Sequence, residues 1–139
     1  MLAHINDKNN LHPKSNSVTP IYHPKKLMVP RSELTEIDPT AVGGEILEGD
    51  VQIFIRLDYV NNNISGGIFE STEGKARVVF PFTEHATFLR GRVRITDVAT
   101  CTKKLLKPGD SYIIEQGTTV IWETITPNAQ KSFLNITTA

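Results

Sequence analysis

Short apolar runs separated by turn signals fill the chain from residue 46 to residue 139. The runs recur about every ten residues, and turns such as residues 61–63, 71–74 and 107–110 lie between them. Residues 92–96 alternate strictly between polar and apolar side chains, so one face of this segment is expected in solvent and the other in a core. No stretch of ten residues has helical periodicity with good helix formers. The pattern predicts an all-β sandwich, jelly roll or barrel.

The expected strands follow from these runs. They cover residues 51–59, 65–70, 76–82, 85–89, 92–96, 105–106, 111–115, 119–125 and 131–137. The turn at residues 71–74 is expected to separate the second of these strands from the third.

Residues 1–45 differ from the rest of the chain. They hold three of the four His residues and five of the eight Pro residues. Because Pro fixes φ and disfavours helix in the residue before it, we expect an extended arm with at most a short helical turn, from Ser32 through Ile37. The sequence thus divides into an N-terminal arm, residues 1–45, and a barrel, residues 46–139. The arm is expected either to fray or to lie across the domain or a partner subunit.

Composition excludes several classes of protein. The 15 basic and 15 acidic residues cancel, which argues against a nucleic-acid partner. A single Cys excludes a disulfide framework and a thiolate zinc cluster. Residues 1–10 lack the apolar core of a secretory signal, and no run approaches the roughly 20 apolar residues of a membrane span. We therefore expect a cytoplasmic protein without a membrane partner.

Four blocks carry a family resemblance, and their order and spacing make it specific. Glu84 is followed after six residues by Gly91, and Gly109 is followed after five by Glu115-Gln116-Gly117. The blocks themselves are residues 67–75, 91–97, 108–115 and 121–124. Over about residues 43–137 the chain resembles the cupin superfamily, and most closely its Cupin_3 branch, which includes ureidoglycine aminohydrolase-like and ethanolamine-utilisation cupins. The resemblance implies a jelly-roll β-barrel and, commonly, a dimer.

The same resemblance makes a metal site doubtful. A metal-binding cupin has a His-x-His pair, a Glu and a third His, and here Arg77, Val79 and Val120 stand at the His places. Glu84 alone remains of the four ligands. One carboxylate is a poor site for catalytic Fe, Mn or Zn, which typically has about three protein ligands. We therefore expect no metal or other cofactor.

The candidate ligand pocket consists of Arg77, Val79, Glu84, Val120 and Trp122. Strand alternation puts Arg77 and Val79 on one face, and the cupin spacing places Arg77 near Glu84 inside the barrel. We hypothesise that the guanidinium replaces the missing metal charge, pairs with Glu84 and holds an anionic ligand. The alternative, equally open, is that Arg77 points into solvent, because a shift of one residue reverses the face.

The other chemistry-bearing residues favour structural interpretations. Trp122 shares the inward face with Val120 and is either a ligand platform or, as we favour, a core residue. Burial in the core is likewise favoured for Phe80, Phe82, Phe88 and Tyr112. His85 is expected on the face opposite to Glu84, at the surface or between sheets rather than as a general base. The arm residues His4, His12 and His23 lack the spacing of a metal site. Cys101 is expected to be an incidental free thiol.

Three functions remain open at this point. The first is a non-metal cupin that binds a small anionic metabolite in the barrel. The second is a metal-dependent enzyme acting on a small nitrogenous substrate, with a rebuilt site. The third is a structural or interaction module. Separately, a homodimer is expected, in which residues near 20–45 pack against the other subunit.

Overall fold

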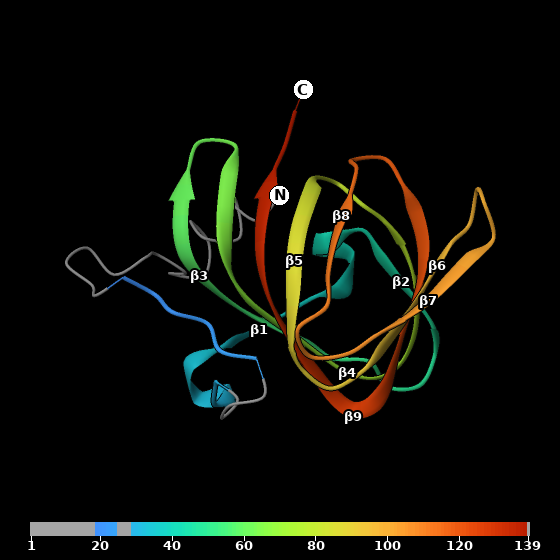
Figure 1. Cartoon of the computed structure of the whole chain (residues 1–139), viewed down its shortest axis with the longest axis horizontal. Coiled ribbons are helices and arrows are strands. Elements are labelled where there is room, and N and C mark those ends of the chain that lie inside the picture. Colours follow the sequence, from blue (N-terminus) through green and yellow to red (C-terminus); the bar gives the residue numbers. More distant parts are fainter. Residues whose placement is uncertain (1–18, 25–28, 139) are drawn as a thin grey trace.

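Nine strands and two short 3-10 helices make up the part of the chain that the computed structural model describes, residues 19–24 and 29–138. Every strand pair is antiparallel, so the all-β class expected from the sequence is confirmed. Within these residues, no helix is long and apolar enough to cross a membrane. The elements are η1 (Arg31–Glu33), β1 (Thr35–Ile37), η2 (Pro39–Val42), β2 (Gly44–Glu48), β3 (Ile53–Asn61), β4 (Ile64–Val79), β5 (Thr83–Arg90), β6 (Val93–Asp97), β7 (Thr102–Leu106), β8 (Ser111–Ile114) and β9 (Thr119–Ile136) (Figure 1).

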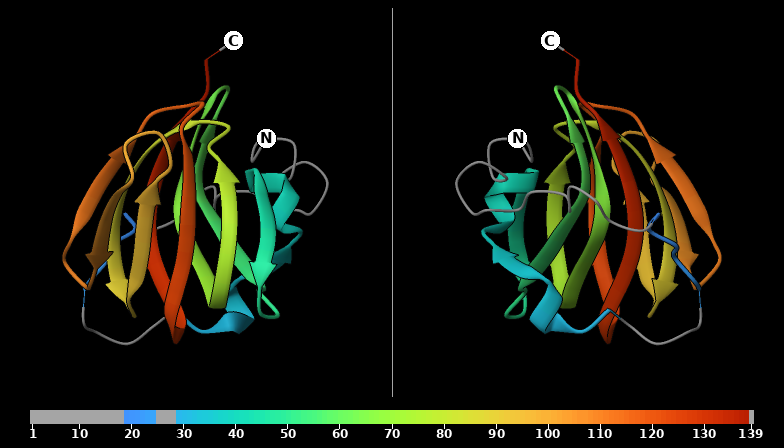
Figure 2. Two further views of the ribbon diagram at one scale, coloured as in Figure 1. Left: turned by 90° about the vertical axis from the view of Figure 1, so that its right-hand side faces the viewer. Right: turned by 90° about the vertical axis from the view of Figure 1, so that its left-hand side faces the viewer.

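The two long strands β4 and β9 lie side by side and belong to both layers of the fold. Residues 64–72 of β4 pair with residues 128–136 of β9, and residues 74–79 pair with residues 119–124. In the first layer, β3 and β1 extend the sheet beyond β4, and β5 and β8 extend it beyond β9. In the second layer, β2 pairs with β4, and β6 joins β9 to β7. The bend of the long strands makes the layers face each other (Figures 1 and 2).

One expected strand boundary is wrong, because residues 119–125 and 131–137 belong to the single strand β9. Two further local expectations are wrong. Residues 71–74 are not a turn between two strands but the bend inside β4, where the register shifts between Thr72 and Gly74. The helical turn expected from Ser32 to Ile37 is replaced by the single turn η1 followed by the strand β1, which pairs with β3. In both cases pairing with a neighbouring strand overrides the local turn or helix signal.

Gly74 makes the bend in β4 possible. Its φ is +143°, which few residues with a side chain adopt. A Cβ atom at this position would lie 2.4 Å from Val51 Cγ2 and 2.7 Å from the Glu48 carbonyl oxygen. The bend therefore needs a residue without a side chain, since both neighbours belong to the adjoining wall of the barrel.

The bend also exchanges the two faces of β4. Ser71 faces the interior before the shift, whereas Ala76 and Val78 face it afterwards. Odd-numbered residues of β4 thus face inward before the shift, and even-numbered residues face inward after it.

The core fills the space between the layers. Trp122 lies at its centre, with its ring centroid 5.9 Å from that of Phe88 and 6.2 Å from that of Phe69. Phe80 and Phe82 are buried in the short connection between β4 and β5. The burial expected for Phe80, Phe82, Phe88 and Trp122 agrees with this packing.

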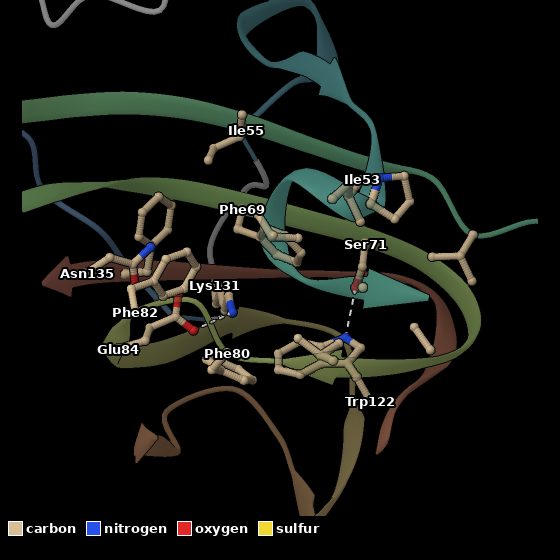
Figure 3. A pocket seen from close by; sticks show the side chains of 17 residues that line it. Ile53, Ile55, Phe69, Ser71, Phe80, Phe82, Glu84, Trp122, Lys131 and Asn135 are labelled. Atoms are coloured by element: carbon tan, nitrogen blue, oxygen red, sulfur yellow. Dashed lines mark hydrogen bonds and ion pairs between the residues drawn. The ribbon is translucent and has the colours of Figure 1, made fainter. Parts of the chain in front are cut away.

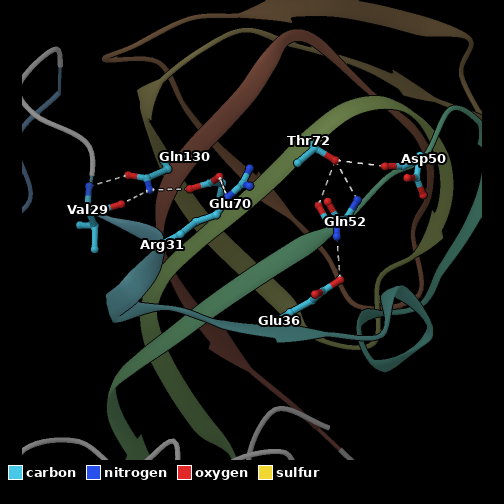
Figure 4. Close-up of polar contacts among 8 residues, drawn as sticks. All are labelled: Val29, Arg31, Glu36, Asp50, Gln52, Glu70, Thr72 and Gln130. Atoms are coloured by element: carbon cyan, nitrogen blue, oxygen red, sulfur yellow. Dashed lines mark hydrogen bonds and ion pairs between the residues drawn. The ribbon is translucent and has the colours of Figure 1, made fainter.

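The segment before β1 lies across the outer face of the first layer, as Figure 4 shows. The Val29 amide donates to Gln130 Oε1, and Gln130 Nε2 donates to the Val29 carbonyl. Arg31 Nε lies 2.9 Å from Glu70 Oε2, and the Glu70 side chain is completely buried beneath it. After this segment, β1 pairs with β3 and β2 pairs with β4. The arm thus contacts its own sheet; a boundary at residue 45 stays a prediction.

Candidate functional site

A cavity lies between the two layers (Figure 3). Its volume, counted as the space open to the centres of water molecules, is about 50 Å³. Because one water needs about 10–15 Å³ by this measure, the space suits a few waters or a ligand of few heavy atoms. Its walls are mainly apolar, with Ile53, Ile55, Phe69, Phe80, Phe82, Trp122 and Phe133 among them. The polar side chains that line it are Ser71, Glu84, Lys131 and Asn135.

Lys131 and Glu84 form a buried ion pair at this cavity. Lys131 Nζ lies 2.7 Å from Glu84 Oε1, and the two side chains are only 5% and 3% exposed. The Tyr112 hydroxyl donates to the same Glu84 oxygen and accepts a hydrogen bond from Lys131 Nζ at 2.7 Å. The three groups come from β5, β8 and β9, so strand pairing fixes their positions.

Aromatic rings surround the Lys131 ammonium group. Its nitrogen lies 4.4 Å from the Trp122 ring and 4.5 Å from the Phe69 ring, and 5.3 Å from that of Tyr112. Ring faces attract a cation, and the attraction grows where water is excluded. Rings and carboxylate together stabilise a positive charge inside a core that would otherwise reject it.

Burial shifts the proton affinities of this cluster. Desolvation lowers the pKa of the Lys131 amine, and the neighbouring Glu84 carboxylate opposes that shift. Desolvation raises the pKa of the Tyr112 hydroxyl well above its ordinary value, and Glu84 adds to this rise by its charge and hydrogen bond. The neutral form of the Lys131 amine is therefore more favourable in this site than it would be in water. The Tyr112 hydroxyl stays protonated.

Asn135 completes the polar part of the cavity. Its side chain is buried, yet neither amide atom has a hydrogen-bond partner among the residues that the structure describes. Such a group costs stability, and its neighbours in most proteins satisfy it. Figure 3 shows Asn135 on the same side of the cavity as Glu84 and Lys131. A ligand that reaches this side would find an amide donor and acceptor.

The structure brings three of the five expected pocket residues inside. Glu84, Val120 and Trp122 are buried, and Glu84 and Trp122 line the cavity. Arg77 and Val79 are exposed, so Arg77 has the outward of the two orientations left open, and the inward position expected for Val79 is wrong. The cause is the shift between Thr72 and Gly74, after which Ala76 and Val78 hold the inward positions. Glu84 still has a positive charge beside it, but Lys131 supplies that charge in place of Arg77.

Sequence reasoning missed Lys131 and Asn135. Both lie two residues from the buried Phe133 in β9 and therefore share its face. This spacing of two is the signal that could have found them. The opposite face of the same segment carries Leu134 and Ile136, which look equally suited to a core. The two faces therefore compete in the sequence, and the packing of the first layer decides between them.

The remaining candidates lie away from the cavity. His85 is exposed on the face opposite to Glu84, as the alternation of β5 predicts. Cys101 is an exposed free thiol and His23 is exposed, while His4 and His12 lie outside the described residues.

The side chains at the cupin metal positions do not fit a metal ion. Arg77, Val79 and Val120 offer no ligand atom, and Glu84 Oε1 already accepts from Lys131 and Tyr112. Across residues 19–24 and 29–138, no three His, Cys, Asp or Glu side chains gather as a metal-binding group.

Comparison with known proteins agrees with the fold. A family model described as the EutQ-like cupin domain, Cupin_3, matches residues 61–133. A search of curated proteins gives no match. The EutQ protein of Clostridium difficile superposes with a TM-score of 0.58 at 12% identity, over 80% of this chain and 81% of that one.

Two further solved structures give similar values. The putative ethanolamine utilization protein Q of Salmonella typhimurium LT2 has a TM-score of 0.52 at 14% identity, over 60% of this chain and 68% of that one. A protein of unknown function from the DUF861 family of Pseudomonas syringae pv. tomato has a TM-score of 0.63 at 16% identity, over 73% of this chain and 43% of that one. At such identities the likeness concerns the fold alone, which is the jelly-roll barrel expected from the sequence.

Proposed function

This chain belongs to the EutQ-like cupin family, and on that premise we propose that its barrel binds a small anionic metabolite without a His-ligated metal. The observation that carries the proposal is the amide of Asn135, which has no partner among the described residues and lines a mainly apolar cavity together with the buried Lys131. Apolar cavities with a few placed polar groups are the usual form of a small-molecule site.

Two donors are available to a carboxylate on the ligand. A lysine ammonium has three N–H bonds, of which Glu84 and Tyr112 take two. The third N–H of Lys131 and the NH₂ group of Asn135 can then donate to the ligand, since both side chains line the same cavity. The aromatic walls contact the apolar body of the ligand.

The charge balance gives this proposal a testable consequence. Lys131 and Glu84 neutralise each other, so an incoming anion leaves the buried site with one negative charge in excess. A buried excess charge is costly, and uptake of one proton removes it. Binding of a carboxylate is therefore expected to strengthen as the pH falls.

Trp122 provides the readout because it is the single Trp of the chain and lines the cavity. We would titrate the full chain with acetate, propionate and pyruvate, and with 1-propanol as the uncharged probe, following Trp122 fluorescence. A carboxylate-specific change that grows toward lower pH, and that Asn135→Leu removes, supports the proposal. Arg77→Ala is the matched control and should bind as the wild type does. Equal responses to propionate and 1-propanol would contradict an anion site.

We also propose that the chain forms a homodimer through the outer face of its first layer. Ile113, Leu134 and Tyr59 lie in one row across that face and are 73%, 45% and 49% exposed, with the exposed His85 between Ile113 and Leu134. Gly66 leaves the row flat between Leu134 and Tyr59, and Tyr22 of the arm bonds to Asp58 beside it. Exposed apolar rows of this kind favour association.

Light scattering tests this part of the proposal. The pair Ile113→Lys and Leu134→Lys should give a monomer, whereas Ile125→Lys, on the second layer, should leave a dimer. Deletion of residues 1–30 should weaken the dimer, since the arm borders the row. A wild-type chain that stays monomeric at high concentration would rule the dimer out.

A further inference from the structure

Lys131 has the surroundings of a reactive amine. Its side chain is 5% exposed, lines the cavity and ends 2.7 Å from a carboxylate oxygen and 2.7 Å from a phenol oxygen. Lys75, by contrast, is 31% exposed and pairs at 3.1 Å with the exposed carboxylate of Glu48. A nucleophilic lysine needs such groups and an environment that disfavours its charge.

We propose that the Lys131 amine condenses with the carbonyl group of a small aldehyde or ketone in the barrel cavity to give a Schiff base. The proposal rests on the proposed function only in that the same cavity admits the molecule. The size of the cavity restricts the partner to short chains, and its walls favour those with an apolar body.

The first half of the step uses Glu84 as base and then as acid. Glu84 accepts one proton from the Lys131 ammonium group, across the 2.7 Å contact, and leaves a neutral amine. The amine lone pair forms a C–N bond with the carbonyl carbon, and the C=O π pair moves to the oxygen. Glu84 returns the proton to that oxygen. The nitrogen then loses a proton to the Glu84 carboxylate, which gives a neutral carbinolamine.

The second half expels water. The nitrogen lone pair forms the C=N bond, the C–O bond breaks, and the hydroxyl leaves as water with the proton held by Glu84. Tyr112 can pass this proton, since it bonds to both groups. One ammonium and one carbonyl group thus give one protonated imine and one water, without an oxidant, a reductant or a net change in protons.

The environment of Lys131 supports this chemistry in two ways. Burial lowers the pKa of the amine, which raises the fraction available as nucleophile near neutral pH. The Trp122 and Phe69 rings, 4.4 and 4.5 Å from the nitrogen, also stabilise the cationic imine after the amine has reacted.

Reductive trapping tests the proposal. The folded full chain is incubated with propanal and cyanoborohydride near neutral pH, and the adducts are located by peptide mass mapping. We expect Lys131 to be labelled several-fold faster than Lys75, because its amine lines the cavity beside a fixed proton acceptor and burial lowers its pKa. Lys131→Arg, which keeps a positive charge beside Glu84, should lose the adduct, and Lys75→Arg should retain it.

The mapping on the wild type decides the question even where Lys131→Arg fails to fold. A preference for Lys131 that disappears in urea supports a site made by the fold. Labelling spread evenly over the exposed lysines, or labelling of Lys131 that appears only in urea, overturns the inference.

The two proposals fail separately. Propionate binding without a propanal adduct removes the Schiff base and leaves the anion site in place. A propanal adduct on Lys131 without any response to carboxylates removes the anion site and leaves the Schiff base.

Discussion

Lys131 Nζ lies 2.7 Å from Glu84 Oε1 inside the barrel, and neither side chain is appreciably exposed. Taking both charges out of water is expensive, and apolar side chains of the same volume often serve a core as well or better. The pair is thus poorly explained by stability alone. It lines the cavity together with Asn135, whose amide is also unfavourable for folding. Costs of this kind concentrate at functional sites, where a ligand or a reaction uses the group.

The first prediction concerns the stability of this pair. Lys131→Met and Glu84→Gln each leave one polar partner buried without its counterpart, and each should lower the free energy of unfolding by about 3–5 kcal/mol. The double variant Lys131→Met with Glu84→Leu should lose much less than the sum, because no charge remains in the core. Urea denaturation of the singles, including Glu84→Leu, and of the double measures the coupling. Additive losses would mean that the two side chains do not interact.

A second prediction follows from the tyrosines and concerns pH. Burial raises the pKa of Tyr112 above its ordinary value of 10.0, so above about pH 10 the folded chain holds a proton that the unfolded chain has lost. The free energy of unfolding should then fall as the pH rises. Lys131 acts in the opposite sense: its lowered pKa makes the unfolded chain bind more protons below 10.5, so stability rises with pH up to that value.

The measurement compares urea midpoints between about pH 9 and about pH 11. Tyr112→Phe should flatten the alkaline decline, and Tyr22→Phe should flatten a further part, because burial and Asp58 also raise the pKa of Tyr22. A slope that is the same in Tyr112→Phe and the wild type would contradict the assignment.

The sequence predicts the architecture well because its signals are spread over many residues. Strand runs, turns and the ordered cupin blocks all agree, and errors at single positions do not change the class. The geometry of the site depends on whether odd-numbered or even-numbered residues of a few strands face inward. One bulge exchanges the two sets. Counting through β4 as if it were regular places Arg77 inside, whereas the shift between Thr72 and Gly74 places Ala76 there.

The missed lysine has a different cause. In β9 the inward face carries the polar residues Lys131 and Asn135, and the outward face carries Leu134 and Ile136. Hydrophobicity alone favours the wrong face. The correct one follows from partners far away in the chain, because Glu84 and Tyr112 supply the contacts that make a buried Lys131 acceptable.

The third prediction tests the bend that sets this parity. Gly74→Ala places a Cβ atom 2.4 Å from Val51 Cγ2 at a φ of +143°, and should cost about 1–3 kcal/mol of unfolding free energy. Gly109→Ala is the matched control: its φ is +96°, but a Cβ atom there meets nothing within 4 Å. Both substitutions strain the backbone, so the difference between them in urea denaturation reports the steric contact. Equal losses would show that the close approach to Val51 is unimportant.

The fourth prediction sets stability against binding at Asn135. Asn135→Leu removes two buried amide atoms that have no partner among the described residues, and adds apolar surface beside Phe133. The variant should therefore unfold at a higher urea concentration, with a gain of about 1–2 kcal/mol, because an unsatisfied polar group carries a cost of that size. The same variant should lose the response of Trp122 fluorescence to propionate, because the ligand then lacks one of its two donors. Asn63→Leu is the control: its amide already donates to the Thr137 carbonyl, so this variant should unfold at a lower urea concentration and keep the propionate response. A variant that is more stable and binds propionate as well as the wild type would separate Asn135 from the site.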